Sequence, residues 1–306
     1  MITALLLAIA LLLAHPVGAE TWRFAVIGDT PYNSYEAREL GPMLEDIAAA
    51  HVSFIVHAGD FKDSGAVCSD ELFENRRSLL DASPAPLIYV PGDNEWVDCR
   101  RLGTGHHDPL ERLRKLRELF FAEARSLGQR TLPLERQSAA YPEHLRWRLG
   151  PVLFLSLNVP GPNNNFGMGS VPSNEFVARN PVLIDWLRQG FAAARHEQSL
   201  GIVIVMQGNP GFKEHAAGLT HAGYRQLLAA LRQETLDFSG QVLLVHGDTH
   251  RQRIDQPLRH PTSRLPIANF TRLETFGYPF MGWVKVIIDT DHPPLFRFEI
   301  YPHQRH

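Results

Sequence analysis

The chain has 306 residues, of which 44% are hydrophobic and 21% are charged, and its formal net charge is −3 at pH 7. This composition is ordinary for a globular protein and excludes a fibrous or low-complexity chain. The small negative charge argues against a general nucleic-acid-binding protein, so we expect no nucleic acid among its partners.

The first nineteen residues, MITALLLAIALLLAHPVGA, form a short apolar run without Asp, Glu, Lys or Arg. The run ends on Val17-Gly18-Ala19, a small-residue pattern that suits signal-peptidase cleavage. It is short for a bilayer span, which needs roughly 20 apolar residues. We expect a signal peptide over 1–19 and a periplasmic or secreted protein, with an uncleaved anchor as the alternative. No later segment is apolar enough over a sufficient length to cross a membrane.

Six apolar, β-rich runs follow, and most of them end in a polar turn. They are WRFAVIGDT, VSFIVHAGD, APLIYVPGDNE, PVLFLSLNV, LGIVIVMQGN and QVLLVHGDTH. Because apolar and polar residues do not alternate in them, they predict strands buried on both faces. Helical patterns separate most of these strands, including 36–50 and a helix that starts at Asp108 and stops by Gly128. The alternation predicts a layered α/β domain with helices on both sides of the sheet.

The last part of the chain shows no helical pattern. NFTRLETFG, WVKVIIDTD and LFRFEIYP are β-rich and joined by short turns, which predicts a C-terminal antiparallel β meander. The polar stretch 158–176 is expected to be a long loop of the kind that is functional or mobile. Because no repeat or linker divides the chain, we expect one domain over 20–306.

The two cysteines, Cys68 and Cys99, each follow a Gly-Asp turn. Export would place them in an oxidising compartment. A disulfide between them would tie two loops together if the two turns are neighbours. Two unrelated buried thiols are the alternative.

Four of the predicted strands end in Gly-Asp, and the acidic residues are Asp29, Asp60, Asp93 and Asp248. One such turn is weak evidence, because Gly and Asp are common turn residues. Open α/β sheets, however, place their ligands outside the carboxyl ends of the strands. Four converging carboxylates repel one another, and a bound divalent metal relieves that repulsion. His250 and Gln207, which follow two of the strands, supply further ligand types, so the sequence predicts a metal site.

At these strand ends the chain resembles the calcineurin-like metallophosphoesterases. GDTP, GDFKD, PGDNEW, VMQGNP and HGDTH stand in the order of that family's metal-binding blocks, and the resemblance runs from about Trp22 to the end of the chain. It implies an α/β fold, a layered β-sandwich of two mixed sheets flanked by helices. It also implies a metal-dependent phosphoesterase, exported if the predicted signal peptide is correct, in which a metal-bridging hydroxide attacks a phosphomonoester or phosphodiester.

Carried over position by position, the resemblance implies two divalent metals. The first is held by Asp29, Asp60 and His250. The second is held by Asp60, Asp93, Gln207 and Asp248, so that Asp60 bridges the two. Oxygen ligands in place of imidazoles shift the preference from Zn²⁺ toward Mn²⁺, Mg²⁺ or Ca²⁺.

The third block departs from the family in a way that bears on catalysis. Asn94 takes the place of the family's catalytic His, and Glu95 is the acidic partner expected to orient it. Asn94 donates hydrogen bonds but cannot transfer a proton. Catalysis by Asp60, Asn94 and Glu95 would therefore need a good leaving group, a third metal-bound water, or another acid such as His106 or His107.

These losses leave a second interpretation open. In it, the chain is a catalytically degenerate protein that keeps the fold and binds a metal or a phosphorylated ligand. Pro31 in place of the first-block His supports this alternative, since proline has no ligating side chain. Every other substituted position keeps a side chain that ligates or hydrogen-bonds, which favours a specialised hydrolase.

Several charged residues near the blocks have two interpretations each. Lys62 either offsets the charge of the carboxylates and meets a phosphate, or is a solvated loop residue. Arg251 and Arg253 either contact a phosphate or lie on the surface. His57 and His246 precede Gly-Asp turns inside buried strands, and we expect them to be structural. The substrate's identity and the oligomeric state have no readable signal.

Overall fold

The structure, a computed structural model, describes residues 21–303. The predicted signal peptide over 1–19 lies outside these described residues. Within residues 21–303, no helix has both the length and the apolar character needed to span a bilayer.

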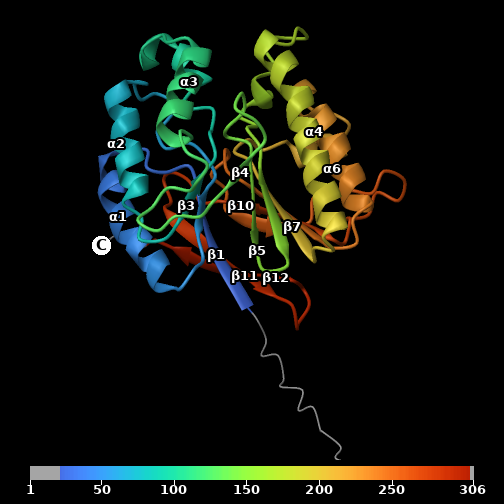
Figure 1. Ribbon diagram of the computed structural model, residues 1–306. Helices are drawn as coiled ribbons and strands as arrows, with labels where there is room; N and C mark the ends of the chain where they lie inside the picture. Colours follow the sequence, from blue (N-terminus) through green and yellow to red (C-terminus); the bar gives the residue numbers. More distant parts are fainter. Residues whose placement is uncertain (1–20, 304–306) are drawn as a thin grey trace, which may run out of the picture.

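Two mixed β-sheets form the centre of the molecule (Figure 1). The first has five strands in the order β12-β11-β1-β2-β3. Their bounds are Thr21–Ile27 for β1, Ile55–His57 for β2, Leu87–Tyr89 for β3, Gly282–Asp289 for β11 and Phe296–Pro302 for β12. The first three run parallel, and β11 is antiparallel to both β1 and β12.

The second sheet has seven strands in the order β4-β5-β6-β7-β8-β10-β9. Their bounds are Glu135–Arg136 for β4, Leu145–Leu149 for β5, Val152–Ser156 for β6, Gly201–Val205 for β7, Gln241–His246 for β8, Arg253–Asp255 for β9 and Phe270–Glu274 for β10. β6, β7, β8 and β10 run parallel, while β5 is antiparallel to β6 and β9 to β10. Two mixed sheets in an α/β arrangement confirm the predicted fold class.

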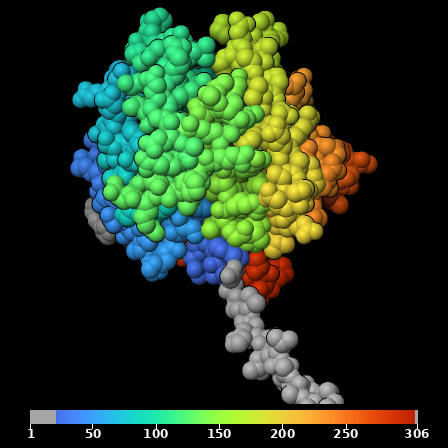
Figure 2. Space-filling model, viewed as in Figure 1, coloured from blue at the N-terminus to red at the C-terminus, as the bar shows by residue number. Residues whose placement is uncertain are grey.

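Helices cover the outer sides of the two sheets (Figure 1). Beside the first sheet lie α1 (Ser34–Ala49), α2 (Asp70–Asp81) and α3 (Pro109–Phe120). Beside the second lie α4 (Asn174–His196) and α6 (Ala222–Leu236), and the short α5 spans Phe212–Ala216. Short 3₁₀ turns occupy Asp98–Arg100, Leu102–Thr104 and Asn163–Asn165. In Figure 2 the green segment between α3 and β6 covers the face between the two helical sides.

The third helix begins where the sequence predicts and ends earlier. Asp108 caps it by accepting a hydrogen bond from the Leu110 backbone N–H, and a proline occupies its first turn. It ends at Phe120 rather than near Gly128. The reason is tertiary, because the backbone of Leu127 pairs with that of Leu87 at the edge of the first sheet.

Aromatic side chains from the facing strands join the two sheets. The Phe24 ring of β1 lies 5.1 Å from the Phe154 ring of β6, and the Phe54 ring lies 5.9 Å from the Trp147 ring of β5. All four side chains are buried. Because this packing holds the sheets face to face, the carboxyl ends of β1–β3 and of β7–β8 open on the same region.

The C-terminal strands follow the prediction in part. β11 and β12 form the expected antiparallel pair. β10, predicted as the first strand of that meander, instead pairs in parallel with β8 in the second sheet. Its Phe270 and Leu273 side chains are fully buried, and the interior of the second sheet gives them an apolar environment.

Candidate metal centre

The six predicted ligands lie in the loops that follow five strands. Asp29 follows β1, Asp60 follows β2 and Asp93 follows β3. Gln207 follows β7, and both Asp248 and His250 follow β8. Four of them have a left-handed backbone, with φ of 50° at Asp29, 57° at Asp60, 78° at Asp248 and 56° at His250. Such backbone strain concentrates at functional sites.

The glycines of the Gly-Asp turns allow these carboxylates to approach one another's backbones. A Cβ atom at Gly92 would collide with the Asp60 carboxylate, and one at Gly247 would collide with the Asp29 carboxylate. The repeated dipeptide is thus a packing requirement of this site as well as a turn signal.

The first predicted ligand set converges around an imidazole nitrogen that carries a lone pair. His250 Nδ1 donates to the backbone oxygen of Tyr278 at 2.8 Å, which is an acceptor only, so Nε2 carries the lone pair. Nε2 lies 3.6 Å from Asp29 Oδ1. Asp29 is fully buried and also accepts from the Asp248 N–H and the Thr275 hydroxyl, both at 3.0 Å. These contacts hold the carboxylate toward His250.

Tyr32 lies at the centre of this set, and the sequence did not predict a role for it. Its hydroxyl is 3.0 Å from His250 Nε2 and 3.3 Å from Asp60 Oδ2, and it accepts from Asn94 Nδ2 at 3.1 Å. Burial, and then the negative charge of Asp60, raises the pKa of the phenol above its ordinary value, so the hydroxyl keeps its proton. The only signal was a tyrosine directly after the GDTP block.

The second predicted set has a different arrangement. Gln207 Nε2 donates to Asp93 Oδ1 at 2.9 Å and to Asp60 Oδ2 at 3.0 Å. Its Oε1 accepts from the Gly161 backbone N–H at 2.6 Å. Asp248 Oδ2 accepts from the backbone N–H of Asn209 at 2.7 Å. The four predicted ligands of this set are neighbours, but the glutamine presents its NH₂ group to the carboxylates rather than its oxygen.

Burial and mutual repulsion raise the pKa values of the predicted carboxylate ligands. Burial, and then the charges of neighbouring carboxylates, raises the pKa values of Asp60 and Asp93 well above normal, and burial likewise raises that of Asp29. Burial also raises the pKa of Asp248 to about 6. A divalent cation among these groups would stabilise their charged forms.

The first set fits a cation and the second, as placed, does not. In the first set, Asp60 Oδ2 and His250 Nε2 face the single proton of the Tyr32 hydroxyl, and Asp29 Oδ1 lies 3.6 Å from His250 Nε2. In the second set, the two carboxylates meet both protons of the Gln207 amide. Over residues 21–303, no group of three or more His, Cys, Asp or Glu side chains is arranged to hold a metal ion as it stands. The tyrosine hydroxyl and the glutamine amide lie between the acidic groups.

Glu95 has a different contact from the one expected. Its buried carboxylate accepts from the backbone N–H groups of Asp60 at 3.0 Å and Gly92 at 2.7 Å, and from the Tyr89 hydroxyl at 2.6 Å. The Asn94 side chain instead donates to the backbone oxygen of Lys62 and to Tyr32. Glu95 therefore positions the backbone of two strand-end loops, and its contacts do not include the Asn94 amide.

Lys62 is buried, so its interpretation as a solvated residue is wrong. Its ammonium group donates to the backbone oxygens of Asp63 and Asn94, both at 2.9 Å. Burial lowers the pKa of Lys62, and the charge of Glu95 opposes this. The lysine thus places a positive charge beneath the Asp60 and Asn94 loops.

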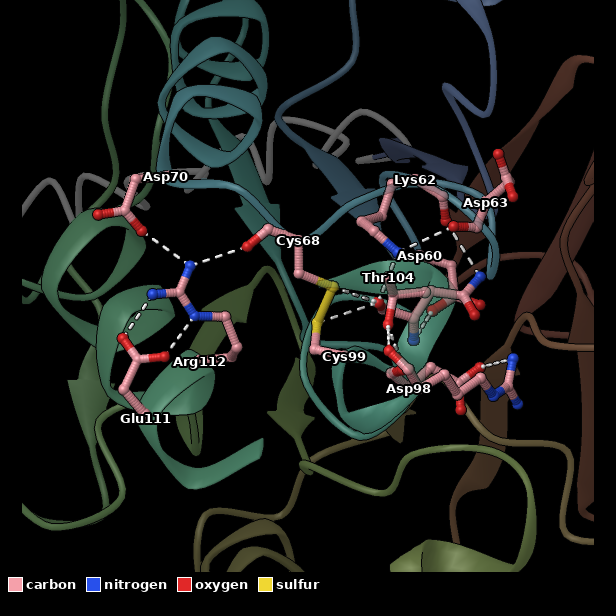
Figure 3. Close-up of a disulfide and its surroundings, with 12 residues drawn as sticks. Asp60, Lys62, Asp63, Cys68, Asp70, Asp98, Cys99, Thr104, Glu111 and Arg112 are labelled. Carbon is pink, nitrogen blue, oxygen red and sulfur yellow. Dashed lines mark hydrogen bonds and ion pairs between the residues drawn. A yellow bond between two sulfur atoms is a disulfide. The ribbon is translucent and has the colours of Figure 1, made fainter. Parts of the chain in front are cut away.

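The Cys68–Cys99 disulfide is present, which confirms its prediction (Figure 3). Both sulfur atoms lie within 3.7 Å of the Asn94 backbone oxygen. On the other side, Arg112 donates to the Cys68 backbone oxygen at 2.9 Å and to Asp70 at 2.7 Å. The disulfide connects the loops after β2 and β3 next to the backbone of Asn94.

The remaining candidates divide into structural and peripheral residues. His57 and His246 are buried and bond to backbone oxygens, and burial lowers the pKa of each to about 4, as expected for structural histidines. His106 is exposed and contacts the Arg100 backbone oxygen, and its described contacts include no predicted ligand. His107 bonds through its backbone N–H to the Cys99 oxygen.

A basic cavity of about 830 Å³ lies beside the ligands. Asn209 and Thr249, neighbours in sequence of the ligands at 207, 248 and 250, stand on its wall. Arg253 lines it but pairs with Glu274, whereas the exposed Arg251 has no ion pair among the described residues. No predicted metal ligand lines this cavity, so it flanks the centre.

Carboxylates and an imidazole thus gather at the strand ends of two packed sheets. This arrangement is typical of metal-binding α/β proteins. Residues 23–252, more than half of the chain, match the calcineurin-like phosphoesterase family, and the chain belongs to that family. No curated protein gives a significant sequence match.

Two solved structures show the same fold. A dimetal phosphatase from Danio rerio is 12% identical, with a TM-score of 0.51, and the match covers 92% of this chain and 99% of that chain. A structure of PhoD is 14% identical, with a TM-score of 0.57, and the match covers 92% of this chain and 68% of that chain. At such identities the likeness establishes the fold.

Proposed function

We propose that the chain is an exported, metal-dependent phosphoesterase that hydrolyses a small-molecule phosphomonoester or phosphodiester. The observation that carries the proposal is the convergence of Asp29, Asp60 and His250, with Nε2 of the imidazole unprotonated and 3.6 Å from the Asp29 carboxylate. Family membership supports the reaction class. The apolar run over 1–19 supports export to the periplasm or beyond.

A divalent cation held by Asp29, Asp60 and His250 would supply a Lewis acid that withdraws charge from the phosphoryl oxygens. The chain itself supplies hydrogen-bond donors at the same place. The Tyr32 hydroxyl faces Asp60 and His250, and the Asn94 amide lies 3.1 Å from that hydroxyl. We assign them to orient the phosphoryl group and to stabilise its charge in the transition state.

Neither donor is a good source of a proton for the leaving group. Asn94 has no titratable proton, and the raised pKa of Tyr32 makes its proton hard to transfer at neutral pH. The enzyme is therefore expected to favour substrates whose leaving group departs as a stable anion, such as an aryl phosphate. The basic cavity that holds Arg251 suits a substrate with additional negative charge.

The test is a metal analysis combined with an activity panel. The purified mature protein is assayed on aryl and alkyl phosphomonoesters and diesters with Mn²⁺, Mg²⁺, Ca²⁺ or Zn²⁺. We expect metal-dependent turnover that Asp60→Asn and His250→Ala abolish. Asp46→Asn and His196→Ala, which change the same residue types at exposed positions of α1 and α4, serve as controls.

Two results would contradict the proposal. Metal binding without turnover of any ester would favour a degenerate binding protein, the alternative that Asn94 supports. Failure to bind any of the four metals would exclude both functions.

A further inference from the structure

The amide of Gln207 stands where a second cation would be needed. We propose that the centre takes a single divalent cation, at Asp29, Asp60 and His250, and that the Gln207 amide bridges Asp60 and Asp93 in place of a second one. The inference rests on the proposed function, because it assumes that the first set binds metal.

The glutamine amide donates to both carboxylates at once. An amide NH₂ group has two protons, and here one points to Asp93 Oδ1 at 2.9 Å and the other to Asp60 Oδ2 at 3.0 Å. All three side chains are buried. The two N–H dipoles thus supply positive charge between two carboxylates without a cation.

The orientation of that amide is determined by the backbone. Gly161 donates its N–H to Gln207 Oε1 at 2.6 Å. If the amide turned over to offer its oxygen to a cation, its NH₂ group would face the Gly161 N–H, and two buried donors would oppose each other. A buried donor without an acceptor is destabilising, which opposes the turn.

Packing also prevents the glutamine from moving aside. The side chain is fully buried, and a Cβ atom placed on Gly59 would lie only 2.7 Å from Gln207 Cγ. The aliphatic part of the glutamine therefore fills the space that the glycine leaves. A cation between Asp60 and Asp93 would have to displace a fully buried side chain that packs closely against Gly59.

The first set lacks these obstacles. His250 Nε2 already presents its lone pair, and the Tyr32 hydroxyl satisfies only one of the acceptors around it at a time. Tyr32 is half-buried, whereas Gln207 is fully buried. A divalent cation that enters here replaces the hydrogen bond from the Tyr32 hydroxyl as the partner of these acceptors. No backbone hydrogen bond has to break.

The test counts metal ions and measures their coupling, independently of activity. The mature full-length protein is loaded with excess Mn²⁺, passed through a desalting column and analysed for manganese per chain and by electron paramagnetic resonance. We expect one Mn²⁺ per chain and the six-line spectrum of an isolated ion. The His250→Ala variant is expected to lose that ion.

A matched pair of variants tests the role of the amide. Gln207→Glu keeps an acceptor for the Gly161 N–H and offers an oxygen in place of the NH₂ group. We expect it to bind two Mn²⁺ ions and to show the spectrum of an exchange-coupled pair. Gln189→Glu, which adds the same charge on the exposed face of α4, should stay at one. Gln207→Ala, which removes the amide, is the second variant if Gln207→Glu does not fold.

The outcomes separate this inference from the proposed function. Two coupled Mn²⁺ ions in the unaltered protein would overturn the inference and leave the phosphoesterase proposal standing. No bound Mn²⁺, Mg²⁺, Ca²⁺ or Zn²⁺ would overturn both. One Mn²⁺ in the unaltered protein and also in folded Gln207→Glu and Gln207→Ala would contradict the role assigned to the amide.

Discussion

At the scale of single residues, the centre is organised around a hydroxyl group. Tyr32 contacts Asp60, His250 and Asn94, which come from three different strand-end loops. A hydroxyl at this place donates a hydrogen bond to one oxygen of a bound phosphoryl group. The family's third-block histidine is Asn94 here, so this phenol is one of the few donors left to the site.

We predict that Tyr32→Phe lowers kcat by about 10²-fold, the usual loss when one donor to a developing negative charge is removed. The ring remains, so KM and the metal content should change little. Steady-state kinetics on an aryl phosphate, together with metal analysis, check this. Tyr141→Phe, which removes an exposed hydroxyl that bonds to the Ala178 backbone oxygen, is the control. An unchanged kcat in Tyr32→Phe would exclude the assigned role.

At the scale of elements, the site depends on loops that leave neighbouring strands. The loops after β2 and β3 carry Asp60 and Asp93, and two connections join them. Glu95 bonds to the backbone of both loops, and both sulfur atoms of the Cys68–Cys99 disulfide (Figure 3) contact the Asn94 backbone oxygen. These connections hold the carboxylates together against their repulsion.

We predict that a Cys68→Ser/Cys99→Ser double variant loses about 3–4 kcal/mol of unfolding free energy, the expectation for a cross-link that closes a loop of this length. The cysteines are 31 residues apart in sequence. Urea denaturation of the two proteins measures the difference, and reduction of the unaltered protein should reproduce it. Equal stability of the reduced and oxidised forms would contradict the prediction.

At the scale of the whole molecule, buried histidines couple stability to pH. His144 is fully buried before β5, and its Nδ1 lies 2.6 Å from the Gln137 side-chain oxygen. Burial lowers its pKa from 6.5 to about 4, against the opposing charge of the neighbouring Glu143. The unfolded chain therefore binds a proton between pH 6.5 and 4 that the folded chain does not bind. The stability from this group is full above pH 6.5 and is lost as the pH falls toward 4.

We predict that His144→Gln flattens the acid side of the stability profile. The unaltered protein should lose up to about 3 kcal/mol more than the variant between pH 6.5 and 4, as a pKa difference of that size implies. Both proteins keep His57 and His246, so the difference isolates this residue. Urea denaturation at several pH values measures it, and parallel profiles would contradict the assignment.

Local patterns in the sequence were enough to predict a large part of the molecule. Apolar runs that end in Gly-Asp predict buried strands and place acidic groups at their carboxyl ends, because strand burial and turn chemistry depend on nearby residues. The order of the five blocks indicated the family and the two-sheet fold. The positions of Cys68 and Cys99, each after a Gly-Asp turn, favoured a disulfide between them. The strands and their polar ends follow from local patterns along the chain, whereas the family and the two-sheet fold follow from the resemblance.

Contacts between distant residues were decided only by the tertiary structure. The Gly161 N–H orients the Gln207 amide across 46 positions, and Tyr32 reaches His250 across 218. The pairing of β10 with β8 and the early end of α3 also depend on distant partners. The sequence by itself determined which ligand types stand at the strand ends. Only the folded chain decided which atoms face one another, because an amide has a donor side and an acceptor side, and only its surroundings choose between them.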